Sequence, residues 1–355
     1  MIKILKWTIA FSFFAGSLFV LFSTHFSPAR HFMLSVFALM IPTITLLNFL
    51  LLIYYLIRKS PMLFLPLFIL IIFAVKYLPA TINYNFSPEI PSENSFKVLS
   101  YNVSQFARPQ KYYFDRRWKG DSVMAKSKGI IDFVANYEAD IKCLQEFYTD
   151  SNSVLYNTSE KISRGHHLNV VQSTKLLRIN RAKFGVAIFS RFPVVNHGEL
   201  IYSNNEFNRG VYADLKIGND TVRVINIHLQ SNQLKIAAKR KFLSKWKYDE
   251  IRRAKQTDQL TEFISKSPYR IILCGDFNST PYGYVYNEFN KDLANSFEYR
   301  GSGIGGTFHF GQFPILRIDH HFFSDGLGVE EFNTLDSITY SDHYPIEGKY
   351  QIRSF

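Results

Sequence analysis

Acidic, amide and imidazole side chains stand at the ends of several strand-like apolar segments of this sequence. The clearest segment is Ile271 to Pro281, in which four apolar residues run into Gly275 and are followed by Asp276, Asn278 and a proline. Side chains alternate along a strand, so Asp276 and Asn278 should point the same way while Phe277 points into the core. Taken alone, the segment has a second interpretation, a strand end with turn-forming Asp and Asn.

The same pattern recurs elsewhere along the chain. Polar residues end or follow apolar segments at Asn102, Glu146, His228 and Asp319, and a further polar segment supplies Asp342 and His343. A carboxylate or amide that is buried alone is strongly destabilising, so such groups normally share a metal ion or a hydrogen-bond network. Acids, amides and two histidines, in a chain with only two cysteines, are typical of a site for a hard divalent cation.

Six motifs in this order resemble the endonuclease/exonuclease/phosphatase superfamily. They are Leu-Ser-Tyr-Asn-Val at 99–103, Leu-Gln-Glu at 144–146, Ile-His-Leu at 227–229, Gly-Asp-Phe-Asn-Ser-Thr-Pro at 275–281, Ile-Asp-His at 318–320 and Ser-Asp-His-Tyr-Pro at 341–345. That superfamily includes deoxyribonucleases, abasic-site endonucleases, neutral sphingomyelinases and inositol polyphosphate 5-phosphatases. The resemblance covers about residues 96–352. It implies a four-layer α/β sandwich, with two packed mixed β-sheets flanked by helices and the site at the strand ends.

The resemblance also implies a divalent cation, Mg²⁺ with Mn²⁺ as the alternative ion. Glu146 would bind it, with Asn102 alongside and Asp342 close by. An oxygen-rich pocket suits Mg²⁺, which keeps waters and bridges to phosphate oxygens. Ser104 stands where abasic-site nucleases tend to have an acid or an amide, so the resemblance to that branch is weaker.

The remaining motif residues are expected to carry out the reaction itself. By resemblance, Asp276 would orient or deprotonate the attacking water, and Asn278 would hold that water or a phosphate oxygen. His343, with its imidazole fixed by Asp319, would lie against the scissile phosphate. His228 resembles the second phosphate-facing histidine of the deoxyribonuclease and sphingomyelinase branches. A histidine pair can stabilise charge on the phosphoryl group or protonate the leaving oxygen.

Several residues also have a purely structural interpretation. Asn102 could cap a turn and His228 could be a satisfied core histidine. Arg209 could meet a substrate phosphate or be a paired or solvated surface residue. The basic run 235–255 could contact nucleic acid or a membrane surface, with a solvated helix face as the default expectation. Structural roles are expected for the other histidines considered, which are His166, His167, His309, His320 and His321.

The first 80 residues have the composition of a membrane anchor. Three apolar stretches, at about 7–24, 32–57 and 62–80, approach or exceed the roughly 20 residues needed to cross a bilayer, so we expect three transmembrane helices. The first stretch has a signal peptide as its alternative, but no convincing cleavage site follows it. Lys3, Lys6, Arg58 and Lys59 mark cytoplasmic segments, which places the rest of the chain on the other side of the membrane. The predicted location is therefore a multi-pass position in a cytoplasmic or inner membrane.

The remainder divides into a polar linker at 81–95 and a catalytic domain at 96–355. Of 41 basic and 29 acidic residues, six and one lie in the first 90, so residues 91–355 carry a net charge of +7. This excess favours an anionic partner without choosing among nucleic acid, phospholipid headgroups and phosphorylated small molecules, and it could equally be a solubility feature. From residue 96 onward, strand and helix signals alternate.

Together these observations predict a membrane-anchored, metal-dependent phosphoester hydrolase, first of all a phosphodiesterase or endonuclease acting on nucleic acid. A sphingomyelinase-like lipid phosphodiesterase or a phosphatase is the alternative within the same class. A non-catalytic membrane protein that binds an anion is the alternative of another class, and the retained set of acids, amides and histidines argues against it. A transporter is disfavoured because the apolar stretches carry no acid or paired charge. No protein partner is inferred.

Overall fold

Two six-stranded sheets form the centre of the computed structural model, which describes residues 1–84, 95–108, 120–166, 169–177, 182–202, 207–231, 242–310 and 313–353. The first sheet has the order β15 (Leu327–Thr334), β16 (Ile346–Ile352), β2 (Phe96–Asn102), β3 (Ile141–Thr149), β5 (Lys183–Ser190) and β4 (Asn169–Leu176). The second has the order β10 (Ala294–Asn295), β14 (Asp319–Phe323), β9 (Arg270–Asp276), β8 (Asp220–His228), β7 (Arg209–Ile217) and β6 (Val194–Ile201).

Each sheet is mixed and contains one parallel pair at its centre. β2 runs parallel to β3, and β8 runs parallel to β9, whereas the other neighbours are antiparallel. β7 and β8 form a hairpin around Gly218. Two short pairs complete the strands, β1 (Asn83–Tyr84) with β11 (Ser302–Gly303) and β12 (Phe308–Phe310) with β13 (Phe313–Leu316).

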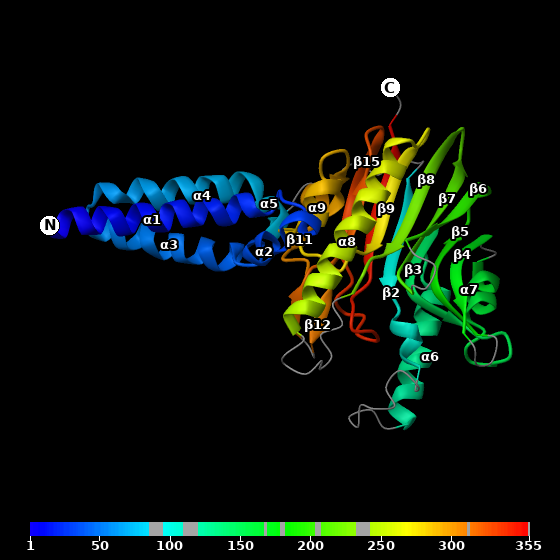
Figure 1. Cartoon of the computed structure of the whole chain (residues 1–355). Helices are drawn as coiled ribbons and strands as arrows, with labels where there is room; N and C mark the ends of the chain where they lie inside the picture. Colours follow the sequence, from blue (N-terminus) through cyan, green and yellow to red (C-terminus); the bar gives the residue numbers. More distant parts are fainter. Residues whose placement is uncertain are drawn as a thin grey trace.

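The central strands are apolar on both faces because both faces are covered. Between the sheets, Val98 and Cys143 pack in one cluster with Val224 and Cys274. Both cysteines are buried and free. The outer face of the first sheet packs against α6 (Gly120–Asn136) and α7 (Thr158–His166), and that of the second packs against α8 (Phe242–Ser265) and α9 (Tyr284–Phe289). The short α10 (Ser296–Arg300) follows β10. The layers are therefore helix, sheet, sheet and helix, as predicted (Figure 1).

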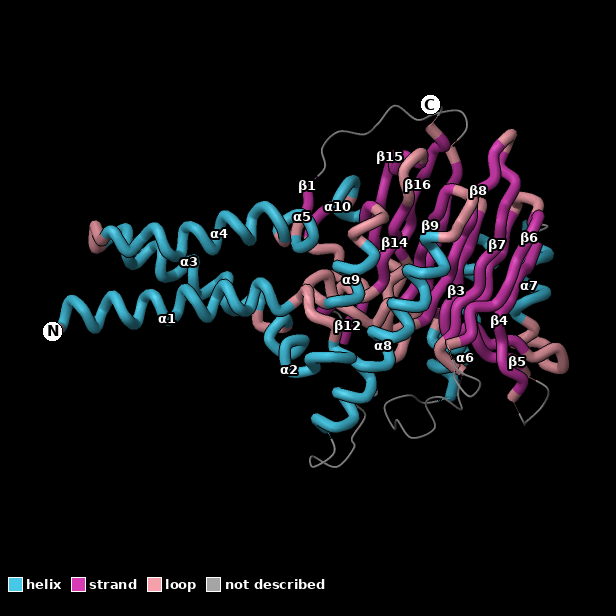
Figure 2. The backbone as a smooth tube through the Cα atoms, turned by 45° about the horizontal axis from the view of Figure 1, so that its top comes forward, coloured by secondary structure: helices cyan, strands magenta, loops and turns pink. Residues whose placement is uncertain are grey.

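The amino-terminal helices form a rod that projects from the sandwich. α1 (Ile2–Ser23), α3 (Ile41–Ile57) and α4 (Phe64–Lys76) lie side by side, with Met1 at the end away from the sheets (Figure 1). Asn48 of α3 is buried in this rod and donates to Ser17 Oγ of α1 over 3.0 Å. α2 (Pro28–Ala38) lies at the base of the rod, between α1 and α3 in sequence, and packs on α8 (Figure 2).

The prediction of three transmembrane helices is wrong for the third helix, which was placed at about 62–80. Among the described residues, two helical stretches are long and apolar enough to cross a membrane, Lys3–Ser23 and Pro28–Ile57. The apolar residues from 61 to 81 are divided instead into the 3-10 helix η1 (Pro61–Leu63), α4 and α5 (Leu78–Thr81). Ser60 Oγ accepts from the Met62 amide, which starts a new turn there, and α4 then contains only 13 residues. At about 1.5 Å per residue this helix is shorter than a hydrocarbon core of about 30 Å.

The rod is fastened to the sandwich by side-chain contacts. Thr81 Oγ1 lies 2.9 Å from the hydroxyl of Tyr282, and Tyr77 packs on the same ring. Asn83 donates to the carbonyl oxygens of Phe297 and Glu298 over 2.8 and 2.7 Å. Most of the predicted linker, residues 85–94, lies outside the described residues.

Candidate active site

The predicted polar residues meet at one edge of the sandwich because of strand direction and register. β2, β3, β8 and β9 finish at this edge, which we call the polar edge, and the antiparallel β14 begins there. In the second sheet His228 lies opposite Asp276, which in turn lies opposite Asp319, so the three residues form a row across β8, β9 and β14. Asp276 is two residues beyond Cys274, which faces the space between the sheets, so the row faces the same space.

The carboxylate of Asp276 is the centre of this arrangement. Its Oδ2 accepts a hydrogen bond from Asn102 Nδ2 over 2.9 Å, which joins the two sheets. The same oxygen lies 3.6 Å from His228 Nε2 and 3.8 Å from His343 Nε2. Oδ1 accepts from the backbone N–H of Asn278 over 2.8 Å. Three nitrogen groups from separate segments therefore surround a carboxylate that is 1% exposed.

His343 is held in one orientation by Asp319. Its Nδ1 lies 2.8 Å from Asp319 Oδ2, which leaves Nε2 facing Asp276. Phe308 packs edge-on against the imidazole at 5.2 Å and bridges to the backbone of the same residue. Thr307 Oγ1 accepts the backbone N–H of Asp319 over 3.1 Å. These contacts fix both members of the Asp–His pair.

Burial and charge act in opposite senses on each of the two central groups, and the net pKa shift of both groups is upward. Burial raises the pKa of Asp276, and the charge of His343 offsets part of that rise. Burial lowers the pKa of His343, but the charges of Asp319 and Asp276 outweigh it and raise the pKa to about 10. At neutral pH the site therefore holds an imidazolium beside a carboxylate whose basicity is increased.

Strained backbone is concentrated at this edge. Among the described residues, seven that are not glycine have positive φ, and six of them lie in segments that carry predicted site residues. Ser104 to Ala107, which begin two residues after Asn102, form a left-handed turn with φ between 48° and 56°; Glu146 has φ 47° and Asn278 has φ 49°. Each left-handed residue costs about 1–2 kcal/mol, and such strain clusters at functional sites.

Comparison with known proteins decides the family. Residues 99–343 match the profile of the Endonuclease/Exonuclease/phosphatase family. The chain belongs to this family. Residues 2–80 match a second profile, which is described as a domain of unknown function.

Solved structures with the same fold cover nearly all of the sandwich. An endonuclease/exonuclease/phosphatase family protein from Bacteroides thetaiotaomicron is 18% identical, with a TM-score of 0.54 over 76% of this chain and 100% of that one. The human Nocturnin catalytic domain with bound sulfate anion is 17% identical, with a TM-score of 0.54 over 74% and 97% of the two chains.

A curated relative is the CCR4-Not complex 3'-5'-exoribonuclease subunit Ccr4 of Candida albicans, which is 25% identical over 341 residues. The alignment covers 76% of this chain and 42% of the relative, so the chain spans less than half of that protein's length.

The other predicted residues, Glu146, Asp342 and Arg209, lie outside the cluster around Asp276. Glu146 lies in a bulge of β3 and is half-buried. It follows Gln145, which pairs with Asn102 of β2, so it lies at the polar edge. Asp342 is exposed and accepts from Ser341 Oγ over 3.2 Å. Arg209 is buried near the start of β7 and pairs with Glu199 at 3.3 Å. The predicted residues thus comprise a tight cluster, two acids nearby and an arginine with an acidic partner.

The donors at the polar edge fit the divalent cations that enzymes of this family generally use. Ligand atoms of Asp276, Asp319 and His343 lie within 4.8 Å of one another. However, Asp319 and His343 already satisfy each other through their 2.8 Å contact, so an ion bound by all three would break it. By donor type, the oxygens of Glu146, Asp342 and Asn102 also suit a hard cation.

Several supporting residues of this family member carry no obvious sequence signal. Ser341 Oγ donates to the backbone carbonyl of Asn102 over 2.7 Å. Gln145 Nε2 donates to Asn226 Oδ1 over 2.7 Å and to Ser100 Oγ over 3.1 Å, which forms a buried polar link between the sheets. These residues stand inside the recognised motifs or beside them, and burial of a polar strand residue is the signal that could have indicated them.

Structural contacts account for His309, His320 and His321. His320 Nε2 lies 2.9 Å from the carbonyl of Ser279, and His321 Nδ1 lies 3.0 Å from the hydroxyl of Tyr350. Burial lowers the pKa of each to about 3. His309 stacks on Tyr344 at 4.4 Å. His167 and the side chain of His166 lie outside the described residues.

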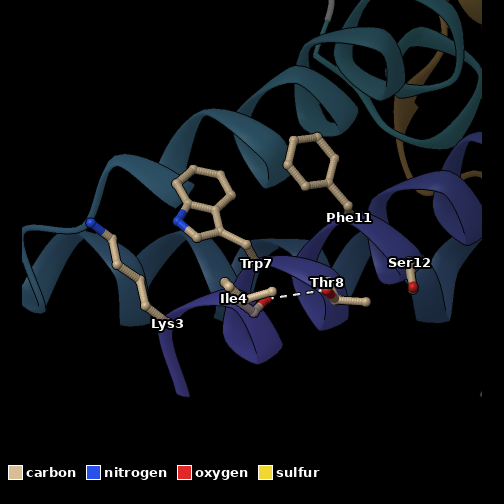
Figure 3. Close-up of a pocket in the computed structure, with 6 residues that line it drawn as sticks. All are labelled: Lys3, Ile4, Trp7, Thr8, Phe11 and Ser12. Atoms are coloured by element: carbon tan, nitrogen blue, oxygen red, sulfur yellow. Dashed lines mark hydrogen bonds between the residues drawn. The ribbon is translucent and has the colours of Figure 1, made fainter. Parts of the chain in front are cut away.

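A hollow of about 550 Å³ occurs at the opposite end of the molecule. It lies on α1 and is lined by Lys3, Ile4, Trp7, Thr8, Phe11 and Ser12 (Figure 3). Its lining is mainly apolar and contains no acid or histidine, so it offers none of the groups that hydrolysis requires.

Proposed function

We propose that this chain is a membrane-anchored, metal-dependent phosphodiesterase that acts on nucleic acid. The observation that carries the proposal is the Asp276 carboxylate, which is approached by Asn102, His228 and His343 within 3.8 Å at the end of two packed sheets. The family match and the exoribonuclease named among the relatives support a nuclease-type reaction. The net charge of +7 on residues 91–355 favours a polyanionic substrate.

In this proposal each cluster residue has one task. Asp276, with its raised pKa, accepts a proton from the attacking water, and Asn278 holds that water or a phosphate oxygen. His343, charged and oriented by Asp319, presents Nε2 to the phosphate and can donate its proton to the leaving oxygen. His228 presents a second Nε2 to the same space. Water forms a new bond to phosphorus and loses a proton to Asp276, while the bond to the leaving oxygen breaks and that oxygen takes a proton from His343, so the products are an alcohol and a phosphomonoester anion.

Glu146, Asn102 and Asp342 would hold the divalent cation beside this cluster. A Mg²⁺ or Mn²⁺ ion bound there supplies positive charge that polarises the phosphate. Arg209 is a weaker candidate for substrate binding because Glu199 and Ser173 already lie 3.3 and 3.4 Å from its Nη1. Alanine variants of Glu146, Asn102 and Asp342 test the cation site, and Arg209→Ala tests substrate binding. In each case KM and kcat are compared with those of the unmodified chain.

Membrane attachment is supported by the arrangement of the rod. The turn between α3 and α4, which contains Arg58 and Lys59, lies at the same end of the rod as Met1, away from the sandwich (Figure 1). Lys3 and Lys6 belong to this end too, and basic residues mark the cytoplasmic side. From this turn η1, α4 and α5, which together span residues 61–81, return beside α1 to the sandwich, so we infer that the sandwich lies outside the cytoplasm. Thiol labelling of a cysteine placed at position 95 tests this orientation, and labelling only from the cytoplasmic side would contradict it.

A lipid phosphodiester is the second candidate substrate. It is favoured by the firm attachment of the rod to the sandwich through Thr81, Tyr282 and Asn83, which keeps the polar edge close to a bilayer. Incubating the purified full chain with DNA, RNA and phospholipid vesicles in the presence of Mg²⁺ separates the candidates. Turnover of RNA or DNA alone supports the proposal, and turnover of phospholipid alone replaces nucleic acid as the substrate. If the folded chain turns over none of these substrates, the proposal that it is a phosphoester hydrolase is refuted.

A further inference from the structure

α2 and the first turns of α8 form one surface beside the rod. Phe32 of α2 packs edge-on against Trp246 of α8 with ring centroids 5.7 Å apart, and Phe242 contacts the same indole at 6.2 Å. The two helices lie together at the base of the rod (Figure 2). We call their exposed and half-exposed residues the aromatic-basic patch, which consists of Met33, Phe242, Leu243, Trp246, Lys247 and Tyr248.

This patch leaves large apolar side chains uncovered. Met33 is 63% exposed, Leu243 is 64% exposed and Tyr248 is 51% exposed. The rest of α8 differs, since its exposed positions are Lys255, Asp258, Gln259, Glu262 and Ser265. The exposed apolar side chains of α8 are thus confined to the end that touches α2. Such patches mark interaction surfaces.

The charges of the patch favour an anionic partner. Asp249 is fully buried 3.6 Å from Lys245, and Glu250 accepts from Arg253 over 2.8 Å, so both acids of this part of α8 face bases of the same helix. Lys247 is exposed. α2 contributes Arg30 and contains no acid.

The position of the patch identifies that partner. α2 forms the start of Pro28–Ile57, the second of the two stretches that can cross a membrane, so the patch adjoins the apolar surface of that stretch. We propose that the aromatic-basic patch lies in the headgroup region of that membrane and binds anionic phospholipid. Aromatic and aliphatic side chains mixed with lysine are typical of helices that lie in this region. Nucleic acid is disfavoured because phosphate binding gives no role to exposed Leu243 and Met33.

This inference rests on the proposed membrane anchoring and links the membrane to the active site. The opposite face of α8 holds the chain directly after His228. Arg253 Nε donates to the carbonyl of Gln230 over 2.9 Å, and Gln256 Oε1 accepts the Gln230 amide over 2.9 Å. Lipid bound to one face of α8 therefore fixes a helix whose other face positions the end of β8.

An environment-sensitive nitrobenzoxadiazole label tests the contact in the full chain in lipid nanodiscs. The label is attached to Leu243→Cys, with Ser265→Cys at the other end of α8 as the matched control and Leu50→Cys on α3 as the anchor reference. Ser265 is exposed and Leu50 is 53% exposed. Cys143 and Cys274 are buried, and the chain without an added cysteine reports any labelling of them.

We expect position 243 to show blue-shifted, brighter emission in discs of phosphatidylcholine with phosphatidylglycerol, and a smaller shift in phosphatidylcholine alone. Position 265 should show neither. Lys247→Glu should reduce the shift at position 243, whereas Lys247→Arg should retain it. Shifted emission at position 50 without any at 243 overturns the patch proposal while leaving the anchor intact. Unshifted emission at both overturns the anchor as well. A shift at 243 that RNA produces and phosphatidylglycerol does not would reassign the patch to nucleic acid.

Discussion

At the scale of single residues, Asp276 is the group on which the proposed reaction depends most. It accepts from Asn102 and Asn278 and faces the Nε2 atoms of His228 and His343. Asp276→Asn keeps the size of the side chain but removes its ability to accept a proton. We expect kcat to fall by at least ~10²-fold, as for loss of a general base. Turnover of the preferred substrate with Mg²⁺ measures this.

The matched control for this change is Asp325→Asn. Asp325 is an exposed acid in the turn between β14 and β15. Its replacement changes the net charge by the same amount, so it should leave kcat unchanged. Equal activity of Asp276→Asn and the unmodified chain would remove the proposed role of Asp276.

The Asp319–His343 pair predicts a particular dependence of stability on pH. The pKa of His343 is raised from 6.5 to about 10 in the folded chain, mainly by Asp319 once the opposing effect of burial is overcome. Because the folded pKa is the higher one, the stabilisation is complete below pH 6.5 and is lost as the pH rises toward about 10. Asp319→Asn should shrink this loss. Urea unfolding at several pH values measures it, and an unchanged profile would contradict the assignment.

At the scale of elements, the junction of β8 and β9 requires a glycine at position 275. Gly275 has φ +141°, and an added Cβ would lie 2.0 Å from the carbonyl oxygen of Ile227. Gly275→Ala should therefore separate the two strands that carry His228 and Asp276. We expect a loss of more than about 3 kcal/mol in unfolding free energy, measured by chemical denaturation.

Gly218→Ala provides the comparison for this prediction. Gly218 also has a left-handed φ of +58°, but no atom lies within 4 Å of its added Cβ. The cost should be only that of the backbone conformation, about 1 kcal/mol. Similar losses for the two variants would show that the close approach of β8 and β9 is not what constrains position 275.

The elements that sequence patterns predict are those buried on both faces. Four of the motifs named from the sequence fall in or at the ends of β2, β3, β8 and β9, whose residues are almost all buried. No motif falls in β4, β6 or β15, which are edge strands. An edge strand exposes one side and carries more polar residues, so its apolar signal is weaker.

The site divides in a similar way. Motif residues such as Asp276 and His343 were expected because their types and order are distinctive. The contacts of Thr307 with Asp319 and of Ser341 with Asn102 could not be predicted, although Ser341 belongs to the last motif, since they depend on how loops return to the polar edge. The left-handed turn at 104–107 could not be expected either, because it contains no glycine or asparagine to mark it.

At the scale of the whole molecule, the attachment of rod to sandwich should be measurable as a coupling energy. Thr81 Oγ1 and the hydroxyl of Tyr282 lie 2.9 Å apart across the junction. We expect Thr81→Ala and Tyr282→Phe to be coupled by about 0.5–1.5 kcal/mol in a double-mutant cycle on the full chain, the usual range for a hydrogen bond. Additive effects on unfolding in detergent would show that the junction is not formed in solution.

The direction of the polar edge has a consequence for how a substrate arrives. In Figure 1 the rod extends to one side of the sandwich, whereas β2 and β8 run across the direction of the rod. If the rod stands upright in a bilayer, the active site opens along the membrane surface. A flexible strand spread over that surface can then enter lengthwise, while the headgroup of a lipid in the same leaflet would have to be lifted out of its layer. Orientation alone would thereby discriminate in favour of long, surface-bound polymers.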